Sequence, residues 1–345
     1  MKLRVGVIGV GPMGMGHVRH YRALDDCELV AVVDRDPQRR AEAATLSGAQ
    51  AFASVEDILG RVDAVSIASP TVTHTEVALQ CIEAGIHILV EKPLAQSEAH
   101  ARQIVDAAAK KGVTLQVGHI ERFNPAFSAA KEVVNDPRYV IADRLSPYSF
   151  RSRDIGVVLD MMIHDLDIIF EFIDDEVASF EAIGIPVLSP SEDMCDVRLR
   201  FKGGAIADVR ASRVSMKRMR KFRLFQSDGY VSIDYGQRSI STFRMSEAVR
   251  SGDLDPLSVD PTQLEDPFGF VFGEMLEVEE HSMESKDALR AELRSFLDAC
   301  RGLHPPEVTG EDGLRAVLLA DRIQVAVKEY LDQEARRAGI DLPKA

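Results

Sequence analysis

Cysteine is scarce in this sequence, and the spacing of the few cysteines excludes two kinds of site. The chain of 345 residues contains four, which lie far apart and form no CxxC pair: Cys27, Cys81, Cys195 and Cys300. Such spacing argues against a zinc site built from cysteines and against a disulfide framework. A reducing compartment, most simply the cytoplasm, is therefore the expected setting.

Long hydrophobic runs are absent as well. No stretch of about eighteen apolar residues occurs, so no transmembrane helix is predicted. The N-terminal stretch MKLRVGVIGVGPMG is apolar, but glycines interrupt it and no small-residue cleavage site follows. We interpret it as a strand and a turn rather than as a signal peptide.

Basic residues are outnumbered by acidic ones. The chain has 41 lysines and arginines against 55 aspartates and glutamates, which gives a formal net charge of −14. A surface of this charge repels nucleic acid and anionic membranes, so neither is an expected partner. An anionic small ligand is still compatible with the charge, provided that a local cluster of positive groups receives it.

The first third of the chain alternates apolar runs with helical patterns. The runs are rich in Val, Ile and Leu, which is typical of strands buried on both faces. They lie at residues 3–9, 28–34, 63–69, 87–93 and 113–119. Strands separated by helices predict βαβ units with right-handed crossovers, so a doubly wound parallel sheet of the Rossmann type is expected over residues 1–121.

The pattern changes after about residue 122. A helix is predicted over residues 160–172, and consecutive β-strands follow it, with turn signals at Gly203-Gly204 and Asp228-Gly229. Residues 122–286 are therefore expected to form a second, α/β domain with an open, mostly antiparallel sheet. This domain would hold the substrate and mediate oligomerisation.

The C-terminal part returns to helical patterns. A long surface loop is expected at residues 251–267, which are rich in Pro and Asp, and helices are expected at 287–300 and 313–334. These helices belong to a third segment, residues 287–345, whose last residues are expected to fray.

A GxGxxG pattern directly follows the first predicted strand. Gly9 allows a tight turn, Gly11 lets the backbone approach a pyrophosphate, and Gly14 lets the next helix pack closely on the sheet. Pro12 and Met13 open that helix, whose N-terminal N–H groups favour phosphate. Together with the surrounding strand and helix, the pattern predicts a dinucleotide-binding turn.

The end of the second predicted strand bears on the choice of nicotinamide cofactor. Asp34 would accept hydrogen bonds from a ribose 2′-hydroxyl and repel a 2′-phosphate, which favours NAD. Its neighbour Arg35 weakens this inference, because an arginine can clamp a 2′-phosphate or stack on adenine. NAD is therefore the predicted cofactor, and NADP is the alternative.

Three further motifs resemble those of the Gfo/Idh/MocA family of sugar and polyol oxidoreductases. They are Glu91-Lys92-Pro93, Asp160-x-x-x-His164 and Ser69-Pro70-Thr71-x-x-His74. The resemblance implies a Rossmann domain plus an α/β domain with an open sheet, and a last helix that packs back on the first domain. It also implies cofactor contacts from Ser69, Pro70, Thr71, His74, Glu91 and Lys92.

A finer resemblance is to the bacterial nucleotide-sugar 3-dehydrogenases. It rests on the stretch from Gly118 to Pro125 and on the stretch from Arg153 to Asp167. It implies oxidation of UDP-N-acetylglucosamine at C3 to a 3-keto sugar, in diamino-sugar synthesis of the lipid A type. A downstream aminotransferase would be a partner.

Oxidation of a secondary alcohol needs a base, a hydride acceptor and a positive group that holds the oxygen. Asp160 and His164 are four positions apart, which places both on one face of a helix, so the carboxylate can orient the imidazole as general base. Lys92 follows a parallel strand and would hold the reacting oxygen, and a cis Lys92–Pro93 bond is anticipated. An alternative interpretation to catalysis is that His164 and Asp165 form only a polar patch on an amphipathic helix. A metal site at His164, Asp165 and Asp167 is not expected, since hydride transfer to nicotinamide needs no metal.

Several polar residues flank the proposed cleft in sequence and are candidates to bind the substrate. They are His119, Arg122, Asn124, Arg151, Arg153 and His164. A diphosphate would require such groups, although they are equally typical of solvated loops. An open sheet also needs covering, so a homodimer or homotetramer is expected.

Two other functions remain open at this point. One is a dehydrogenase of a free sugar, an inositol or a UDP-uronic acid, since the motifs are shared within the family. The other belongs to a different class, a regulatory protein that senses a nicotinamide cofactor without chemistry. The joint presence of Lys92, Asp160 and His164 argues against the regulator.

Overall fold

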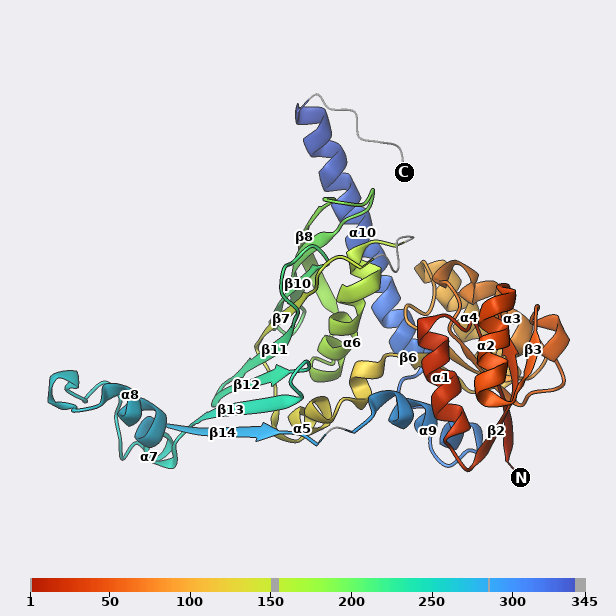
Figure 1. The fold of residues 1–345 in the computed structure, drawn as a ribbon. Helices are drawn as coiled ribbons and strands as arrows, with labels where there is room; N and C mark the ends of the chain where they lie inside the picture. Colours follow the sequence, from red (N-terminus) through yellow and green to blue (C-terminus); the bar gives the residue numbers. More distant parts are fainter. Residues whose placement is uncertain (1, 150–154, 285, 339–345) are drawn as a thin grey trace. The chain divides into compact units, whose positions relative to one another are not determined.

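Figure 1 shows the fold in a computed structural model, which describes residues 2–149, 155–284 and 286–338. The chain forms two compact units, each assembled from separate stretches of sequence. The first unit comprises Met1–Phe123, Val158–Asp167 and Asp287–Ala326, and the second comprises Asn124–Val157, Ile168–Lys286 and Val327–Ala345. The sequence divides the chain at residues 121 and 286. By its internal packing, the short stretch Val158–Asp167 belongs with the N-terminal residues.

The first unit is built on a six-stranded parallel sheet. Its spatial order is β3-β2-β1-β4-β5-β6, and every neighbouring pair is parallel. The strands are β1 (Leu3–Ile8), β2 (Cys27–Val33), β3 (Gln50–Phe52), β4 (Ala64–Ile67), β5 (His87–Glu91) and β6 (Leu115–Gly118). The predicted doubly wound sheet is confirmed, and only the three-residue β3 is an addition.

Helices cover this sheet because its strands are apolar on both faces. They are α1 (Pro12–Arg22), α2 (Pro37–Ser47), α3 (His74–Glu83), α4 (Glu98–Lys111), α9 (Ala288–Cys300) and the first part of α10 (Gly310–Ala338). A core cluster joins Val5 and Val32 of the sheet to Tyr21 of α1 and to Leu293 and Phe296 of α9. Two short 3₁₀ turns, η1 (Glu56–Ile58) and η2 (Thr71–Thr73), lie in the connections.

The second unit is built on an eight-stranded sheet in the order β14-β13-β12-β11-β7-β10-β9-β8 (Figure 1). All neighbours are antiparallel except β7 and β10. The strands are β7 (Tyr139–Leu145), β8 (Val177–Ile185), β9 (Met194–Phe201), β10 (Ile206–Ser212), β11 (Met219–Gln226), β12 (Gly229–Asp234), β13 (Ser239–Met245) and β14 (Leu276–Ser282). The predicted open, mostly antiparallel sheet is confirmed.

Burial alternates along the central strands of this sheet, so one face carries its apolar core. Phe222 of β11 packs against Phe172, with ring centroids 6.2 Å apart, and Phe172 packs against Phe127 at 5.5 Å. Phe127 lies on α5 (Pro125–Val133), whose N-terminus is capped by the Asn124 side chain. Hence α5 and the end of α6 (Ile163–Phe172) cover the apolar face.

Several local features differ from the sequence prediction, among them β7, which precedes the predicted helix instead of following it. The helix expected at 160–172 begins with a wide π turn, η4 (Val158–Met162), before α6. The region expected to be one long loop is interrupted by a 3₁₀ turn, η5 (Pro261–Gln263), and is bounded by the short helices α7 (Glu247–Ser251) and α8 (Pro267–Phe270).

A second π turn, η6 (Val271–Met275), leads into β14, a strand that the sequence does not predict. Its residues LEVEEHS are almost all exposed, because β14 forms the edge of the sheet beside β13. Glutamates are common on edge strands, where they discourage pairing with a further chain, but they lower the strand signal. Among the described helices, none has the length and apolar character that crossing a membrane requires.

Candidate functional site

The glycine turn lies between β1 and α1 in the first unit, at the carboxyl end of the sheet. Gly9 adopts a left-handed φ of +83°, and a Cβ there would lie 2.5 Å from the Ser69 nitrogen. A Cβ at Gly14 would lie 1.8 Å from the Gly9 carbonyl oxygen. No side chain fits at either position, so these two glycines are required by the turn itself.

Gly11, by contrast, is not required by the packing of the turn itself. A Cβ at Gly11 would meet no atom within 4 Å, so the space beside this residue is open. Gly11 is also the N-cap of α1, where no side chain caps the helix, and Pro12 occupies the first turn. The N-terminal N–H groups of α1 therefore face a site that suits the pyrophosphate of a dinucleotide. Met13 in the same turn is 36% exposed.

Asp34 follows β2 and lies beside this turn. Its Oδ2 accepts the backbone N–H of Val10 at 2.9 Å, and its Oδ1 accepts that of Asp36 at 2.9 Å. Two backbone donors thus fix the carboxylate, which has further lone pairs for ribose hydroxyls. Arg35 is exposed, and its carbonyl accepts a hydrogen bond from Arg40 Nη1 at 3.1 Å. The fixed carboxylate of Asp34 therefore suits the ribose hydroxyls of NAD.

The segment after β4 contains Ser69, Pro70 and Thr71, and His74 joins it to the turn after β5. The His74 ring places Nε2 3.0 Å from the Ser69 carbonyl oxygen and Nδ1 2.9 Å from the Pro93 carbonyl oxygen. The ring is buried, and desolvation lowers the pKa of His74. His74 therefore positions two loops at the carboxyl ends of neighbouring strands. Its direct contact with a cofactor stays a prediction.

Lys92 directly follows β5, and the anticipated Lys92–Pro93 peptide bond is cis. Its Nζ donates a hydrogen bond to the Asp160 carbonyl oxygen at 2.6 Å and lies 3.5 Å from Asp160 Oδ1. The two residues are 68 positions apart in sequence. Both side chains are partly exposed, at 19% and 18%. The ammonium is therefore anchored from one side and accessible to a ligand from another.

His164 lies in the same unit, four residues after Asp160 and at the start of α6. Its ring is edge-on to the ring of His119, with centroids 6.3 Å apart and an interplanar angle of 88°. His119 follows β6 and is 1% exposed; burial lowers the pKa of His119, and the nearby Asp167 carboxylate opposes that change. Among the described residues, neither ring nitrogen of His119 has a hydrogen-bond partner. The ring can therefore serve a polar ligand group.

Arg122 is buried and engaged by Asp167. Its Nε and Nη2 donate to Oδ2 and Oδ1 of Asp167 at 2.8 and 2.7 Å, and Asp312 Oδ1 lies 3.8 Å away. This bidentate pair joins the turn after β6 (η3, Ile120–Phe123) to helix α6. Arg122 is thus a positioning group first, and its contact with a diphosphate stays a prediction. Asn124 caps α5 in the second unit, and Arg151 and Arg153 lie outside the described residues.

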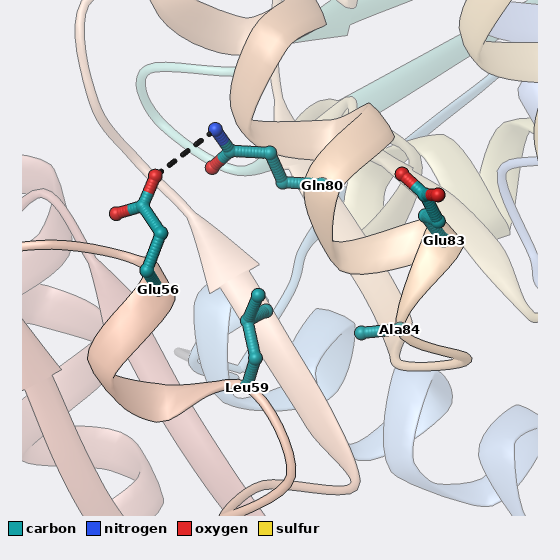
Figure 2. A pocket seen from close by; sticks show the side chains of 5 residues that line it. All are labelled: Glu56, Leu59, Gln80, Glu83 and Ala84. Carbon is teal, nitrogen blue, oxygen red and sulfur yellow. Dashed lines mark hydrogen bonds between the residues drawn. The ribbon is translucent and has the colours of Figure 1, made fainter.

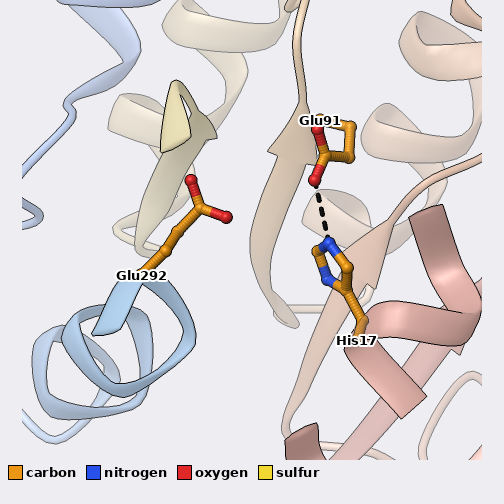
Figure 3. Close-up of side chains that lie close together, drawn as sticks. All are labelled: His17, Glu91 and Glu292. Carbon is orange, nitrogen blue, oxygen red and sulfur yellow. Dashed lines mark hydrogen bonds and ion pairs between the residues drawn. The ribbon is translucent and has the colours of Figure 1, made fainter. Parts of the chain in front are cut away.

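The sequence does not point to three residues that border this site. Asp167 is considered there only as a metal ligand, although its spacing of three from His164 places both on one helical face. His17 and Glu292 lie beside Glu91 and bring ligand-type atoms of all three residues within 4.8 Å of one another (Figure 3). No local signal marks Glu292, which is one polar residue on the amphipathic helix α9.

A pocket of about 250 Å³ lies elsewhere on the first unit (Figure 2). It is lined by Glu56, Leu59, Gln80, Glu83 and Ala84, and Gln80 Nε2 donates to Glu56 Oε1 at 3.2 Å. Its residues precede β4 and end α3, so it lies at the amino end of the sheet. Because α/β sheets bind cofactors at the carboxyl end, we do not assign it to the dinucleotide.

Two family models match the chain. Residues 3–119 match the model described as the oxidoreductase family, NAD-binding Rossmann fold. Residues 134–232 match the model of the GFO/IDH/MocA C-terminal domain. The first match covers the glycine turn, Asp34, Lys92 and His119, and the second covers most of the strands of the second unit.

Comparison with individual proteins gives matches over nearly the whole chain. A UDP-N-acetylglucosamine 3-dehydrogenase from Acidithiobacillus ferrooxidans is 32% identical over 96% of this chain and 99% of its own, and its crystal structure superposes with a TM-score of 0.84. A myo-inositol 2-dehydrogenase from Thermotoga maritima is 27% identical over 95% of this chain and 97% of its own. The WlbA dehydrogenase from Bordetella pertussis, solved with NADH and UDP-GlcNAcA, shares the fold at 20% identity and a TM-score of 0.75, over 96% and 98% of the two chains.

Proposed function

Because the chain belongs to the Gfo/Idh/MocA family of NAD-binding oxidoreductases, we propose that it oxidises a hydroxyl group of a nucleotide sugar. The substrate we propose is UDP-N-acetylglucosamine, oxidised at C3 to the 3-keto sugar. One observation carries the chemistry: Lys92 and Asp160 meet at 2.6 Å in the unit that also holds His164 and the glycine turn. The 32% identical relative carries the choice of substrate.

The roles of the residues follow from their chemistry. When bound, NAD supplies the hydride acceptor. The Lys92 ammonium, oriented by the carbonyl and carboxylate of Asp160, hydrogen-bonds the reacting oxygen and favours loss of its proton. His164 takes that proton, since an imidazole titrates near neutral pH. As His164 takes the hydroxyl proton, the carbinol carbon would become a ketone, and NAD, when bound, would accept the hydride.

Two further residues are proposed to help bind the substrate and the cofactor. His119 offers buried ring nitrogens beside His164, where a sugar hydroxyl or an acetamido group would be received. Asp34 selects NAD, because its fixed carboxylate would repel a 2′-phosphate. In this proposal Arg122 keeps α6 in place through Asp167 rather than binding the diphosphate as its first role.

The surroundings of the reaction are also part of the proposal. All four cysteines are free thiols, which agrees with a reducing compartment such as the cytoplasm. A 3-keto sugar is a substrate for an aminotransferase, so we propose such an enzyme as the downstream partner. We further propose a homodimer or homotetramer, because the open sheet of the second unit leaves β8 and β14 as edges.

The direct test is incubation of the purified protein with NAD and UDP-N-acetylglucosamine. The expected result is formation of NADH together with a product two hydrogens lighter than the substrate. A parallel reaction with His164→Ala controls for contaminating dehydrogenases. If neither NADH nor the keto product forms, UDP-N-acetylglucosamine is not the substrate.

A second candidate is a dehydrogenase of an inositol, a free sugar or a UDP-uronic acid, and the 27% identical myo-inositol 2-dehydrogenase favours it. Turnover of myo-inositol or UDP-glucuronate, without turnover of UDP-N-acetylglucosamine, would select this candidate. A nicotinamide-sensing regulator would instead bind NAD and turn over none of these compounds.

A further inference from the structure

Three titratable side chains meet in the interior of the first unit, next to the proposed site but outside its chemistry. His17 on α1 and Glu292 on α9 are fully buried, and Glu91 at the end of β5 is 7% exposed. His17 Nε2 and Glu91 Oε1 are 2.8 Å apart, and the Glu292 carboxylate lies within 4.8 Å of both (Figure 3).

Glu292 has no partner that would support a negative charge. Within the described part of the chain, neither of its carboxylate oxygens accepts a hydrogen bond. The side chains that face it are Glu91 on β5 and His17 on α1, while Tyr21 on α1 lies within electrostatic reach and Gln116 on β6 contacts its backbone. Gln116 donates to the backbone carbonyl of Glu292, and His17 Nε2 is already engaged by Glu91. An isolated carboxylate in such surroundings is costly, because desolvation is not repaid by a counter-charge.

A proton removes this cost more simply than a metal ion. In a metal site, His17 Nε2 and Glu91 Oε1 would both bind the ion, whereas here they are joined by a hydrogen bond of ordinary length. As a carboxylic acid, Glu292 becomes a donor, and the Glu91 carboxylate, within 4.8 Å, is an acceptor of matching chemistry. Burial beside that carboxylate raises the pKa of Glu292 well above the usual glutamate value.

We propose that Glu292 is a positioning residue that acts as a buried carboxylic acid and, together with His17, holds the Glu91 carboxylate in place. Glu91 is then an anion with three donors: His17 Nε2, the Glu292 acid, and the Lys92 backbone N–H, which lies 3.3 Å from Oε2. A carboxylate can accept about four hydrogen bonds, so this number is within its capacity.

A fixed Glu91 side chain would also fix the position of neighbouring residues of the proposed site. It precedes Lys92 directly, and its side chain packs so closely on β6 that a Cβ at Gly118 would lie 3.0 Å from Glu91 Oε2. Gly118 in turn precedes His119. His17 lies one helical turn after Gly14 on α1. The three buried side chains therefore connect the ends of β5 and β6 to the helix that begins at the glycine turn. The link to turnover rests on the proposed function, whereas the proton on Glu292 does not.

The proton is tested by the dependence of stability on pH, without any substrate. A glutamate whose pKa is raised in the folded state binds more protons folded than unfolded, so it destabilises the protein progressively as pH rises above its unfolded pKa of about 4.3. Glu292→Gln keeps the donor and cannot ionise. We therefore expect its melting temperature to exceed that of the wild type by a margin that grows from about pH 5 to about pH 8.

The exposed Glu83→Gln on α3 is the matched control, and its melting curve should follow the wild type at every pH. Infrared spectroscopy of the wild type at neutral pH should show the carbonyl band of a protonated carboxylic acid, which Glu292→Gln lacks. A constant difference in melting temperature, a missing acid band, or a stoichiometric divalent metal in the purified protein would each overturn the proposal. If Glu292→Gln does not fold, the presence or absence of the acid band in the wild type still tests whether Glu292 is protonated.

The positioning role is tested by comparing two variants that differ only in a donor. Glu292→Leu has a similar size and no donor, so kcat should fall at least about tenfold while the KM for NAD changes less than about threefold. Glu292→Gln should restore most of that kcat and should lose less activity than the wild type at alkaline pH. Equal kcat values for the two variants would refute the positioning role. The proposed function would then still be tested by turnover of the wild type, and the proton on Glu292 by the acid band.

Discussion

The buried pair between Arg122 and Asp167 allows a stability prediction with a defined size. Both side chains are nearly inaccessible, at 3% and 1% exposure, and two hydrogen bonds of 2.8 and 2.7 Å join them. Removing one partner of such a pair costs about 3–5 kcal/mol, because the other charge is left buried without compensation. Asp167→Asn should fall near the lower end of this range, since Asp312 lies 3.8 Å from the guanidinium and keeps part of the compensation.

A second variant distinguishes the effect of an uncompensated charge from the effect of lost packing. Replacing both partners by apolar residues of similar size, as Arg122→Met with Asp167→Leu, leaves no charge unpaired. We expect the double variant to recover most of the loss seen for Asp167→Asn. The control is Asp63→Asn in the same unit. Asp63 also makes a bidentate pair, with Arg4 at 2.7 and 3.2 Å, but the two side chains are 27% and 45% exposed. Its loss should be clearly smaller, because solvent screens an exposed pair.

Urea-induced unfolding, followed by circular dichroism at neutral pH, measures these differences directly. The expected order of stability is wild type, then Asp63→Asn, then the double variant, then Asp167→Asn. A loss below about 1 kcal/mol for Asp167→Asn would mean that the pair behaves like a surface pair. A double variant as unstable as Asp167→Asn would mean that specific hydrogen bonds, rather than an uncompensated charge, hold α6 in place.

The remaining predictions concern the cofactor and the chemistry. Gly11→Ala should fold with a melting temperature near that of the wild type but lose NAD affinity by at least about tenfold in a fluorescence titration, because its Cβ meets no protein atom but points at the pyrophosphate site. Gly14→Ala should instead lower the melting temperature, since its Cβ would lie 1.8 Å from the Gly9 carbonyl oxygen. Equal melting temperatures and equal NAD affinities of the two variants would contradict the proposed pyrophosphate site at the glycine turn. Asp34→Ser should raise kcat/KM for NADP relative to NAD, and an unchanged ratio would remove Asp34 as the selecting group. His164→Ala should lower kcat by about 10²–10⁴ with NAD affinity retained, and unchanged turnover would remove its role as base.

The parts of the fold that the sequence predicts are those whose signal is local. The strands of the first unit are continuous Val, Ile and Ala runs, and the glycine turn depends on conformations within six residues, which is why both are correctly anticipated. The edge strand β14 is missed because its exposed glutamates reflect its position at the edge of a sheet, which neighbouring residues do not encode. The short strand β3 is missed because three residues carry too little periodicity.

The residues of the proposed site also divide into those with a local sequence signal and those without one. Sequence motifs make Lys92, Asp160 and His164 candidates for the site, since each motif is contiguous or has one fixed spacing. They do not reveal that Asp167 engages Arg122, or that Glu292 faces Glu91 from a helix about 200 residues later. Such pairings depend on which strands end side by side, because β4, β5 and β6 are neighbours and their carboxyl ends meet at one edge.

The π turn at Val158–Met162 shows that the spacing of two residues in the sequence does not fix their geometry. A regular α-helix would put Asp160 and His164 one turn apart and direct the Asp160 carbonyl along the helix axis. The wide turn interrupts that pattern just where it gives way to α6, and there the Asp160 carbonyl accepts the Lys92 ammonium at 2.6 Å. Wide turns of this kind occur frequently at functional sites. Asp160 therefore holds Lys92 mainly through its backbone, so that Asp160→Asn should reduce activity less than Lys92→Met does.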